Sequence, residues 1–490
     1  MLELCDLTAV EARWLIGRGE ISPVALLESC LSRIEAVNPA VNAVVALDCE
    51  GARAAAVAAE RAVRHGEFLA PLHGMPVGIK DLDETRGLRT TFGSLLYRDY
   101  VPDADGGIAA RIRAAGGVVF AKTNTPEWGL GANTRNAVYG ATGNPFDPNR
   151  SCAGSSGGSA VALATGMAPL CTGSDMAGSL RTPAAFCGVV GFRPSAGVVP
   201  AEKRVLGWSP LSALGPMART VEDAALLLSV MAGTDDRDPL SHPRARPLFP
   251  LPHVDLRHLR VAWSEDLGFA PVEATIRRTF RARMSASQGW CGSSVEAHPD
   301  CTGADETFAI LRASQVLAAH LDKVRNDRTA CGPNLTANVE EGLRYSFADG
   351  ARAQAMQTRL YRTFRAFFRE HDLLITPAAA ISPRPWRELY PHEIDGVPTN
   401  SYFHWLAIAY AVTLVGHPAV CLPVGRDEHG LPFALQVVGP PGSDAPLLGA
   451  ASALAREFAL DPALVQPRAD VAALATAPPI SASEGFLGWG

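Results

Sequence analysis

The stretch SCAGSSGGSAVALATG, residues 151–166, concentrates serine and glycine in its first nine positions. Serine hydroxyls serve as nucleophiles and proton carriers, whereas clustered glycines also occur in phosphate-binding loops. A phosphate loop needs a lysine after its glycines, and this stretch has none. Residues 154–158 satisfy the nucleophile-elbow pattern G-x-S-x-G, but the NPFDPNRSCA before them does not predict the strand that an elbow must follow. A turn before a helix that starts near Ser159 is the alternative without chemistry.

A second loop of small and hydroxyl-bearing residues, GSDMAGSLRTPAAFCGVVGF, follows at 173–192. One predicted helix and the short apolar run MAPLCT separate it from the first loop. A chain that only changes direction seldom needs hydroxyl groups in both turns. The pair of loops therefore favours a chemical site.

Lys80 ends the apolar run PVGIK, which is typical of a buried strand. Burial would desolvate the ammonium group and lower its pKa towards the range of a general base. No histidine lies in either loop to activate a serine, so Lys80 is the candidate base. The alternative is a surface lysine that pairs with Asp81 or Asp83.

The composition of the 490 residues, 47% hydrophobic and 19% charged, is that of a globular protein. A net charge of −6 provides no basic field for nucleic acid, so a small molecule or a protein is the expected partner. Charged residues interrupt the N-terminal segment, and no apolar run reaches the ~18 residues that a membrane span needs. We expect a cytoplasmic monomer or homodimer without nucleic-acid or membrane partners.

Motifs for metal binding are missing from the sequence. The ten cysteines form no C-x-x-C pair, and there is no H-E-x-x-H motif. His253 and His258 lie in a proline-rich connector, which is a poor setting for a metal site. We therefore expect reduced cysteines and no metal.

Apolar runs alternate with helical stretches from about residue 70 onwards. This pattern predicts an α/β fold with a mixed, mainly parallel β-sheet and helices on both sides. Two runs, residues 418–425 and 431–439, are separated by RDEHG and predict an antiparallel pair of strands.

The chain is expected to have three parts. Residues 1–65 predict an N-terminal helical segment packed on the core, since Thr8 and Glu11 make a capping box. The main domain is expected over residues 66–460, and a C-terminal tail over 461–490. The segment at 235–253, rich in proline and charge, is either a domain boundary or a surface excursion within one domain.

The motif GMPVGIKD, the loop AGSSGGSA and the block SDMAGSLRTPAAFCGVVGFRPS together resemble the amidase signature family. Further segments match as well: KTNTPEWG, GNPFDP, GHPAVCLPVG and GLPFALQVVG. The resemblance covers roughly residues 5–460 and implies the amidase signature fold. It also implies a hydrolase that uses no metal or organic cofactor.

The family uses a Ser, cis-Ser, Lys triad, and the resemblance assigns these three roles by motif. Ser179 corresponds to the nucleophile, Ser155 to the bridging serine and Lys80 to the base. A cis peptide bond between Gly154 and Ser155 is also implied. Neutral Lys80 would accept the nucleophile's proton through the Ser155 hydroxyl and later return it to the leaving amine.

The resemblance also implies an oxyanion hole of backbone N–H groups in the loop that carries the nucleophile. The residues that would donate are Met176, Ala177, Gly178 and Ser179. Asp175 and Arg181 are expected to fix this loop.

Two segments depart from the family pattern. The usual loop is Thr-Asp-x-Gly-Gly-Ser, whereas this chain has SDMAGS at 174–179, and alanine at position 177 is free of strain only if its φ is negative. Cys152, Ala153 and Gly154 stand where the family has Pro-Gly-Gly.

Residues that contact the substrate are expected in two places. By position, Gly129 with the adjacent Trp128 and Leu130 would line the acyl side of the pocket. An opposite wall could be formed by the cluster Tyr402, Phe403, His404 and Trp405. Substrate specificity is expected in the segment from about 290 to 400, which matches the family least.

The expected reaction is hydrolysis of a carboxamide C–N bond through an acyl-enzyme on Ser179. The same triad could cleave carbamates or esters. The chain could also be the glutaminase component of a tRNA-dependent amidotransferase, or a catalytically inactive binding module.

Overall fold

The structure, a computed structural model, describes residues 3–243, 246–286 and 289–488. Within these residues, eleven strands form one large sheet. They are β1 (Val44–Leu47), β2 (Pro76–Lys80), β3 (Val118–Thr123), β8 (Leu170–Asp175), β9 (Val190–Arg193), β10 (Ala213–Ala218), β11 (Arg260–Trp263), β12 (Ser293–Glu296), β13 (Leu373–Pro377), β16 (Ala419–Arg426) and β17 (Pro432–Val438). Their order across the sheet is β1-β3-β2-β8-β10-β9-β16-β17-β13-β11-β12.

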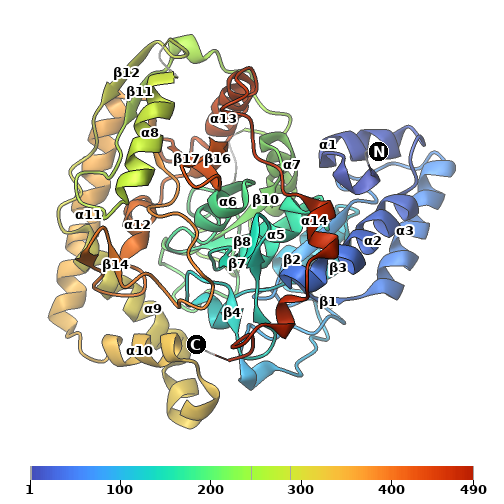
Figure 1. The fold of residues 1–490 in the computed structure, drawn as a ribbon, viewed down its shortest axis with the longest axis horizontal. Helices are drawn as coiled ribbons and strands as arrows, with labels where there is room; N and C mark the ends of the chain where they lie inside the picture. The colour runs from blue at the N-terminus through green and yellow to red at the C-terminus, as the bar shows by residue number, and fades with distance from the viewer. Residues whose placement is uncertain (1–2, 244–245, 287–288, 489–490) are drawn as a thin grey trace.

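Helices cover the sheet, as Figure 1 shows. They are α1 (Ala9–Gly17), α2 (Pro23–Val41), α3 (Cys49–Arg64), α4 (Gly107–Ala114), α5 (Gly157–Ala164), α6 (Arg181–Cys187), α7 (Val221–Met231), α8 (Ala274–Ala286), α9 (Ala304–Asn326), α10 (Pro333–Gly342), α11 (Phe347–Glu370), α12 (Ala407–Leu414), α13 (Asp444–Phe458) and α14 (Val471–Thr476). Among the described residues, three short two-stranded ladders lie outside the main sheet: β4 (Arg135–Asn136) with β5 (Gly140–Ala141), β6 (Gly143–Asn144) with β7 (Asp147–Ser151), and β14 (Glu393–Ile394) with β15 (Val397–Pro398).

The predicted α/β fold with a mixed sheet and flanking helices is confirmed. Parallel pairing occurs in two blocks, β3-β2-β8 and β13-β11-β12, and the other neighbouring strands of the sheet pair antiparallel. The antiparallel pair predicted near the C-terminus is β16 with β17, in which Ala419 faces Val438. Because β2 and β8 run parallel side by side, their carboxyl ends meet at one edge of the sheet.

The N-terminal segment contributes both helices and a strand. The Thr8 hydroxyl accepts a hydrogen bond from the Glu11 N–H at the start of α1, which confirms the capping box. Helix α2 buries an apolar face that includes Leu27, Cys30 and Ile34. Strand β1, which the helical prediction for 1–65 did not include, pairs with the edge of the sheet at β3. This strand ties the segment to the main body.

Residues 235–253 contain no helix or sheet strand in their described part. One hydrophobic cluster includes Met231 before this segment and Ala262 after it. A shared core on both sides favours a surface excursion over a domain boundary. Near the C-terminus, α14 lies against α2.

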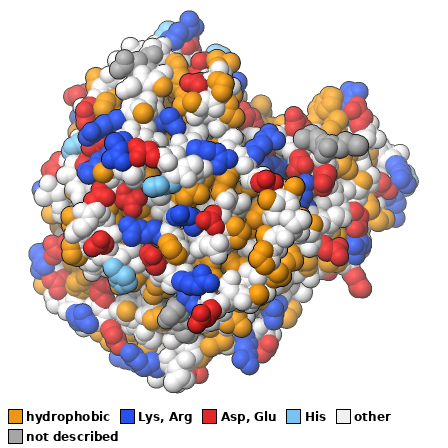
Figure 2. Space-filling view, viewed as in Figure 1, with side chains coloured by type: hydrophobic (Ala, Val, Ile, Leu, Met, Phe, Trp, Pro, Cys, Tyr) orange, Lys and Arg blue, Asp and Glu red, His pale blue; other side chains and the backbone are white. Residues whose placement is uncertain are grey.

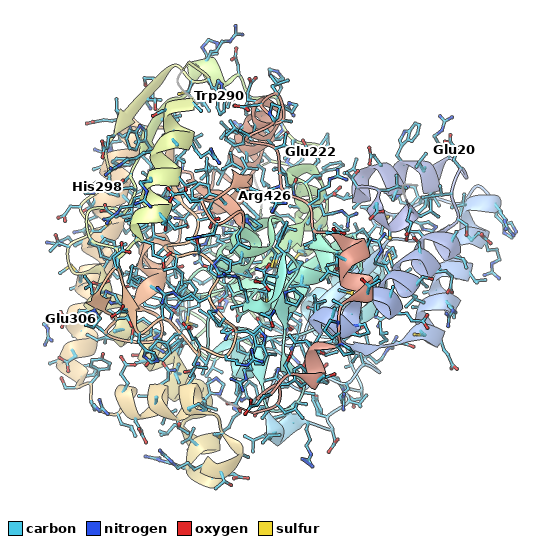
Figure 3. All side chains as sticks on the ribbon, in the orientation of Figure 1. Glu20, Glu222, Trp290, His298, Glu306 and Arg426 are labelled. Carbon is cyan, nitrogen blue, oxygen red and sulfur yellow. The ribbon has the colours of Figure 1, made fainter. Side chains whose placement is uncertain are left out.

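The distribution of charged side chains on the surface agrees with the low net charge of the sequence. Figure 2 shows Lys and Arg side chains interspersed with Asp and Glu over the visible face. In Figure 3, Glu20 and Glu306 lie at the edge of the molecule, where both are exposed. Among the described residues, no helix is both long enough and apolar enough to cross a membrane.

Candidate active site

Lys80 is the last residue of β2, and its side chain is completely buried. Its Nζ donates to three hydroxyl oxygens: Ser155 Oγ at 2.7 Å, Ser156 Oγ at 2.9 Å and Ser174 Oγ at 3.0 Å. Burial lowers the pKa of Lys80 to about 7, although the charges of Asp83 and Asp175 oppose this shift. A lysine with its pKa lowered in this way is partly neutral at neutral pH. The alternative of a surface lysine is therefore wrong.

The partner of Asp81 is a different lysine, which sequence reasoning missed. Lys122, on β3, is also fully buried, and its Nζ lies 3.7 Å from the Asp81 carboxylate. Asp81 also accepts from the N–H and hydroxyl of Thr91, at 3.1 and 2.6 Å. Lys122 thus lies beside a carboxylate that opposes the lowering of the Lys122 pKa by burial. The hydrogen-bond partners of Lys80 Nζ in the described part of the chain are, in contrast, all hydroxyl groups. The KTNT motif was the signal that could have directed attention to Lys122.

Ser155 lies in the loop that leads into α5, and only 2% of it is exposed. The Gly154–Ser155 peptide bond is cis, as the family resemblance implied. Ala153 has φ +58°, a left-handed conformation that glycine adopts at lower cost, which explains why Pro-Gly-Gly is usual here. A Cβ atom added to Gly129 would lie 3.3 Å from Ser155 Oγ. Gly129 therefore borders Ser155.

Ser179 lies in the loop between β8 and α6 and is half-buried. Its carbonyl oxygen accepts a hydrogen bond from the Ser156 N–H at 3.2 Å. This backbone bond joins the two loops that the sequence singled out. The structure thus brings Lys80, Ser155 and Ser179 to the same edge of the sheet, at the carboxyl ends of β2 and β8.

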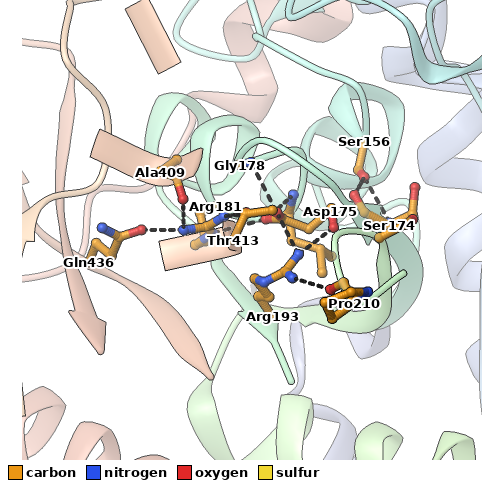
Figure 4. Close-up of polar contacts among 12 residues, drawn as sticks. Ser156, Ser174, Asp175, Gly178, Arg181, Arg193, Pro210, Ala409, Thr413 and Gln436 are labelled. Atoms are coloured by element: carbon orange, nitrogen blue, oxygen red, sulfur yellow. Dashed lines mark hydrogen bonds and ion pairs between the residues drawn. The ribbon is translucent and has the colours of Figure 1, made fainter. Parts of the chain in front are cut away.

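A buried ion cluster fixes the loop that carries Ser179, as Figure 4 shows. The Asp175 carboxylate accepts from the Gly178 N–H at 2.9 Å and the Leu180 N–H at 3.1 Å. It also accepts from Arg181 Nε at 2.9 Å and from Arg193 Nη1 at 3.2 Å. These two guanidinium groups, with the backbone N–H of Gly178, hold the pKa of Asp175 well below its usual range despite burial. Sequence reasoning named Asp175 and Arg181 but missed Arg193, although it lies in the quoted motif GFRPS.

The question raised by alanine at position 177 has a direct answer. Among the described residues of this loop, positive φ occurs at Gly178, with +104°, and not at Ala177. A Cβ atom on Gly178 would also lie 2.7 Å from both the Ala409 Cβ and the Thr182 Oγ1. Position 178 therefore needs glycine, and position 177 does not.

The substitution Gly178→Ala should destabilise the protein by about 2–4 kcal/mol, because it adds backbone strain and a steric overlap. Thermal unfolding followed by circular dichroism measures this change. The matched control is Ala177→Gly, which should cost less than about 1 kcal/mol because it only increases the freedom of the unfolded chain. Equal losses of stability in the two variants would contradict this account of the loop.

The residues that were expected to contact the substrate lie in different environments. Trp128 has φ +52° and stacks on Phe92 with ring centroids 4.7 Å apart, while Lys323 Nζ lies 4.9 Å from its ring centre. Trp128 and Leu130 pack with α9 and α10 in a separate hydrophobic cluster. Of the three residues expected on the acyl side, Gly129 is the one placed against the bridging serine.

The aromatic cluster at 402–405 is divided in a similar way. The Arg312 guanidinium lies 4.1 Å from the Phe403 ring centre and 5.6 Å from that of Tyr402, so both rings cover this buried arginine. Trp405, by contrast, lines a cavity together with Phe186 of α6. In the described part of the chain, no three His, Cys, Asp or Glu side chains are grouped to hold a metal ion.

Comparison with known proteins identifies the family. The sequence model of the family described as Amidase matches residues 25–448. The chain belongs to this family. It is therefore a hydrolase of the amidase type, which acts on carbon–nitrogen bonds in amides.

Several known proteins are similar in sequence or structure to this amidase over nearly its whole length. The acylamidase of Rhodococcus erythropolis is 35% identical over 453 residues, covering 91% of this chain and 94% of the relative. A glutamyl-tRNA(Gln) amidotransferase subunit of Chloroflexus aggregans is 33% identical, covering 93% of this chain and 97% of the relative. Among solved structures, a bacterial aryl acylamidase of the amidase signature family has a TM-score of 0.87 at 25% identity, covering 97% of this chain and 99% of that chain.

Proposed function

We propose that this enzyme hydrolyses a small carboxamide through an acyl-enzyme on Ser179, with Ser155 as the proton bridge and Lys80 as the base. The observation that carries the proposal is the buried Lys80, whose Nζ lies 2.7 Å from Ser155 Oγ and whose hydrogen-bond partners among the described residues are all hydroxyl groups. Its pKa of about 7 leaves a large neutral fraction at physiological pH. The acylamidase relative supports an amide substrate.

The proposed reaction begins with proton transfer. Neutral Lys80 accepts the hydroxyl proton of Ser155. Ser155 in turn accepts the hydroxyl proton of Ser179 while Ser179 Oγ attacks the amide carbon. N–H groups of residues 176–179 would stabilise the resulting oxyanion. Protonated Lys80 then returns the proton through Ser155 to the amine nitrogen, and the C–N bond breaks. Water attacks the acyl-enzyme by the same relay and releases the carboxylic acid.

Two of the three serines that accept hydrogen bonds from Lys80, Ser155 and Ser156, lie in the first loop, and their other contacts favour Ser155 as the bridge. The Ser156 hydroxyl contacts the Ser174 backbone, accepting from its N–H at 3.3 Å and donating to its carbonyl at 3.4 Å (Figure 4). It therefore helps to hold the two loops together. Ser155 makes the shorter contact with Lys80, which suits it to the relay.

The dependence of amide hydrolysis on pH tests the role of Lys80. Only the neutral amine can accept a proton, so kcat/KM should rise about tenfold per pH unit below the Lys80 pKa of about 7 and level off above it. Replacing Ser174 by alanine removes an acceptor that stabilises the ammonium form. The rise should then shift to lower pH by about 1 unit, since a hydrogen bond to a charged group contributes at least about 1.5 kcal/mol and one pKa unit corresponds to about 1.4 kcal/mol.

The matched control for that experiment is Ser174→Thr, which keeps the hydroxyl and should leave the profile in place. A shift of the Ser174→Ala profile to higher pH would contradict the assigned base.

Covalent labelling tests the nucleophile. A fluorophosphonate should add to Ser179, and mass spectrometry of the digested protein should find the modified peptide at this residue. Modification at Ser156 instead would restore the G-x-S-x-G interpretation and overturn the proposed triad. Carbamate and ester analogues of one amide, compared by kcat/KM, would show which leaving group the site favours.

Glutamine hydrolysis is a second candidate, because several relatives at 32–36% identity are glutamyl-tRNA(Gln) amidotransferase subunits. Release of ammonia from glutamine by the purified chain, or only after copurification with other proteins of such a complex, would support this assignment. Efficient turnover of simple amides by the isolated chain would favour the acylamidase assignment.

A further inference from the structure

We propose that the C-terminal segment 480–486 positions the active site, because Phe486 holds the β4–β5 hairpin against the loop that carries Ser155. This inference rests on the proposed role of Ser155 as the proton bridge. The family model ends at residue 448, so the segment lies beyond the part of the chain that this model matches. Phe486 would thus be a positioning residue for the reaction.

The C-terminal segment reaches the hairpin by crossing the N-terminal helices. After α13, the chain passes through α14 and the short 3₁₀ helix η7 (Ile480–Ala482), and both of these elements contact α2. In Figure 1, this red stretch runs beside α2 and ends close to β4. The end of the chain and the hairpin, which are far apart in the sequence, therefore lie side by side.

Phe486 packs directly on the backbone of the hairpin. A Cβ atom added to Gly140 would lie 2.5 Å from both Cε1 and Cζ of Phe486. Gly140 belongs to β5, which pairs with β4. Ile480 joins this contact in a buried hydrophobic cluster with Ala141 and Trp386, against which Phe486 packs. The aromatic ring thus occupies the space that any other side chain at position 140 would fill.

Two arginines bind the backbone of the same segment. Arg135 donates from Nη2 to the Gly485 carbonyl, and Arg387 donates from Nε to the Glu484 carbonyl at 3.3 Å. The two guanidinium groups also lie over the ring of Trp386, at 5.5 and 4.3 Å from its centre. Because Arg135 belongs to β4 and is only 7% exposed, its hydrogen bond attaches the segment to the second strand of the hairpin.

The residue before the hairpin holds the loop of the bridging serine. Thr134 donates from its N–H and its Oγ1 to the Ala153 carbonyl, at 3.1 and 2.8 Å. Its side chain also lies close to the backbone on both sides of Ser155. A Cβ atom on Gly154 would be 3.2 Å from Thr134 Oγ1, and one on Gly157 would be 2.8 Å from Thr134 Cβ. A displaced hairpin would therefore move the backbone that sets the position of Ser155.

A second route joins Trp386 to the same loop. Asn133 donates from Nδ2 to the Trp386 carbonyl at 2.7 Å and accepts at Oδ1 from Ser151 Oγ at 2.8 Å. Ser151 Oγ in turn accepts from the Ala153 N–H at 3.0 Å. These groups are buried, so water does not readily replace a hydrogen bond that is lost among them. The N–H and the carbonyl of Ala153 both depend on residues adjacent to the hairpin.

The kinetics of fluorophosphonate labelling test the proposal on the full chain. Phe486→Ala removes the ring that packs on Gly140, so Ser155 should shift and the rate of Ser179 modification should fall about ten- to a hundredfold. The rise of this rate with pH should also move to lower pH by about 1 unit, because the Lys80 ammonium loses the Ser155 oxygen as an acceptor. Asp83 and Asp175, whose charges act on Lys80, remain in place.

Hydrogen exchange reports on the hairpin itself. The N–H groups of Thr134 and Thr142 donate to the carbonyls of Ala153 and Thr134, and both should exchange about tenfold faster in Phe486→Ala. The matched control is Leu487→Ala, at the next residue, which is 61% exposed and should leave both measurements within about twofold. Phe486→Leu keeps an apolar side chain and should restore most of the labelling rate.

The possible outcomes separate this proposal from the proposed function. Wild-type labelling of Phe486→Ala would overturn the proposal. A lower unfolding temperature with an unchanged labelling rate and pH profile would overturn it as well, because Phe486 would then only stabilise the fold. Absence of Ser179 labelling in the wild-type enzyme would instead contradict the proposed function, and hydrogen exchange would still decide whether Phe486 holds the hairpin.

Discussion

Replacing Ser179 by alanine should lower kcat/KM for amide hydrolysis about 10⁴-fold or more, the scale on which loss of a serine nucleophile acts in other hydrolases. No acyl-enzyme can form without the Ser179 hydroxyl, so the N–H groups of the loop would have no covalent intermediate to stabilise. The protein should fold normally, because the loop is held by Asp175 through the backbone N–H groups of Gly178 and Leu180. Release of the amine product measures activity, and thermal unfolding verifies the fold.

The control for this substitution is Ser156→Ala. Ser156 lies as deep as Ser155 and also contacts Lys80, but its hydroxyl is engaged with the Ser174 backbone. A loss of about tenfold is expected from one disturbed hydrogen bond near the base. If Ser156→Ala abolished turnover and Ser179→Ala retained it, the assigned nucleophile would be wrong.

Local sequence patterns predicted the elements that position the site. The apolar run before Lys80 predicted a buried strand, and burial is what lowers the lysine pKa. The hydroxyl-rich loops were recognisable because serine and glycine are concentrated where periodicity is interrupted. The roles proposed for Ser155 and Ser179 needed the family resemblance, since neither spacing nor composition chooses between Ser155 and Ser156.

Contacts between distant segments could not be predicted from the same patterns. Arg193 binds Asp175 only because β9 lies two strands from β8 in the folded sheet. Lys122 and Asp81 meet because β3 pairs with β2, and single-sequence periodicity does not specify such pairing.

The positive φ angles of non-glycine residues could not be predicted from the sequence patterns either. Trp128 has positive φ and packs towards α9, so its neighbour Gly129 remains beside Ser155 while the indole does not. Sequence reasoning placed the three consecutive residues 128–130 on one wall because it had no measure of local φ. The fold separates them into two environments.

Replacing Lys80 by methionine should separate amide from ester hydrolysis. Methionine keeps the buried side chain's approximate volume but cannot accept or return a proton. For an amide, kcat/KM should fall about 10³- to 10⁴-fold, because the amine leaving group needs the returned proton as the C–N bond breaks. An ester with the same acyl group should lose about tenfold to a hundredfold, because an alkoxide or phenolate leaves more readily without protonation. Paired assays of the two substrates measure the ratio directly.

Lys122→Met provides a matched control, because Lys122 is an equally buried lysine on the adjacent strand. Its loss leaves the buried Asp81 carboxylate without its cation, and about 3–5 kcal/mol of stability should be lost. The ratio of amide to ester turnover in the folded fraction should nevertheless stay that of the wild type, since Lys122 makes no contact with Ser155 in the described hydrogen bonds. Equal losses on both substrates in Lys80→Met would show that Lys80 only supports the fold. A selective loss of amide hydrolysis would instead show that Lys80 supplies the proton that the leaving amine receives.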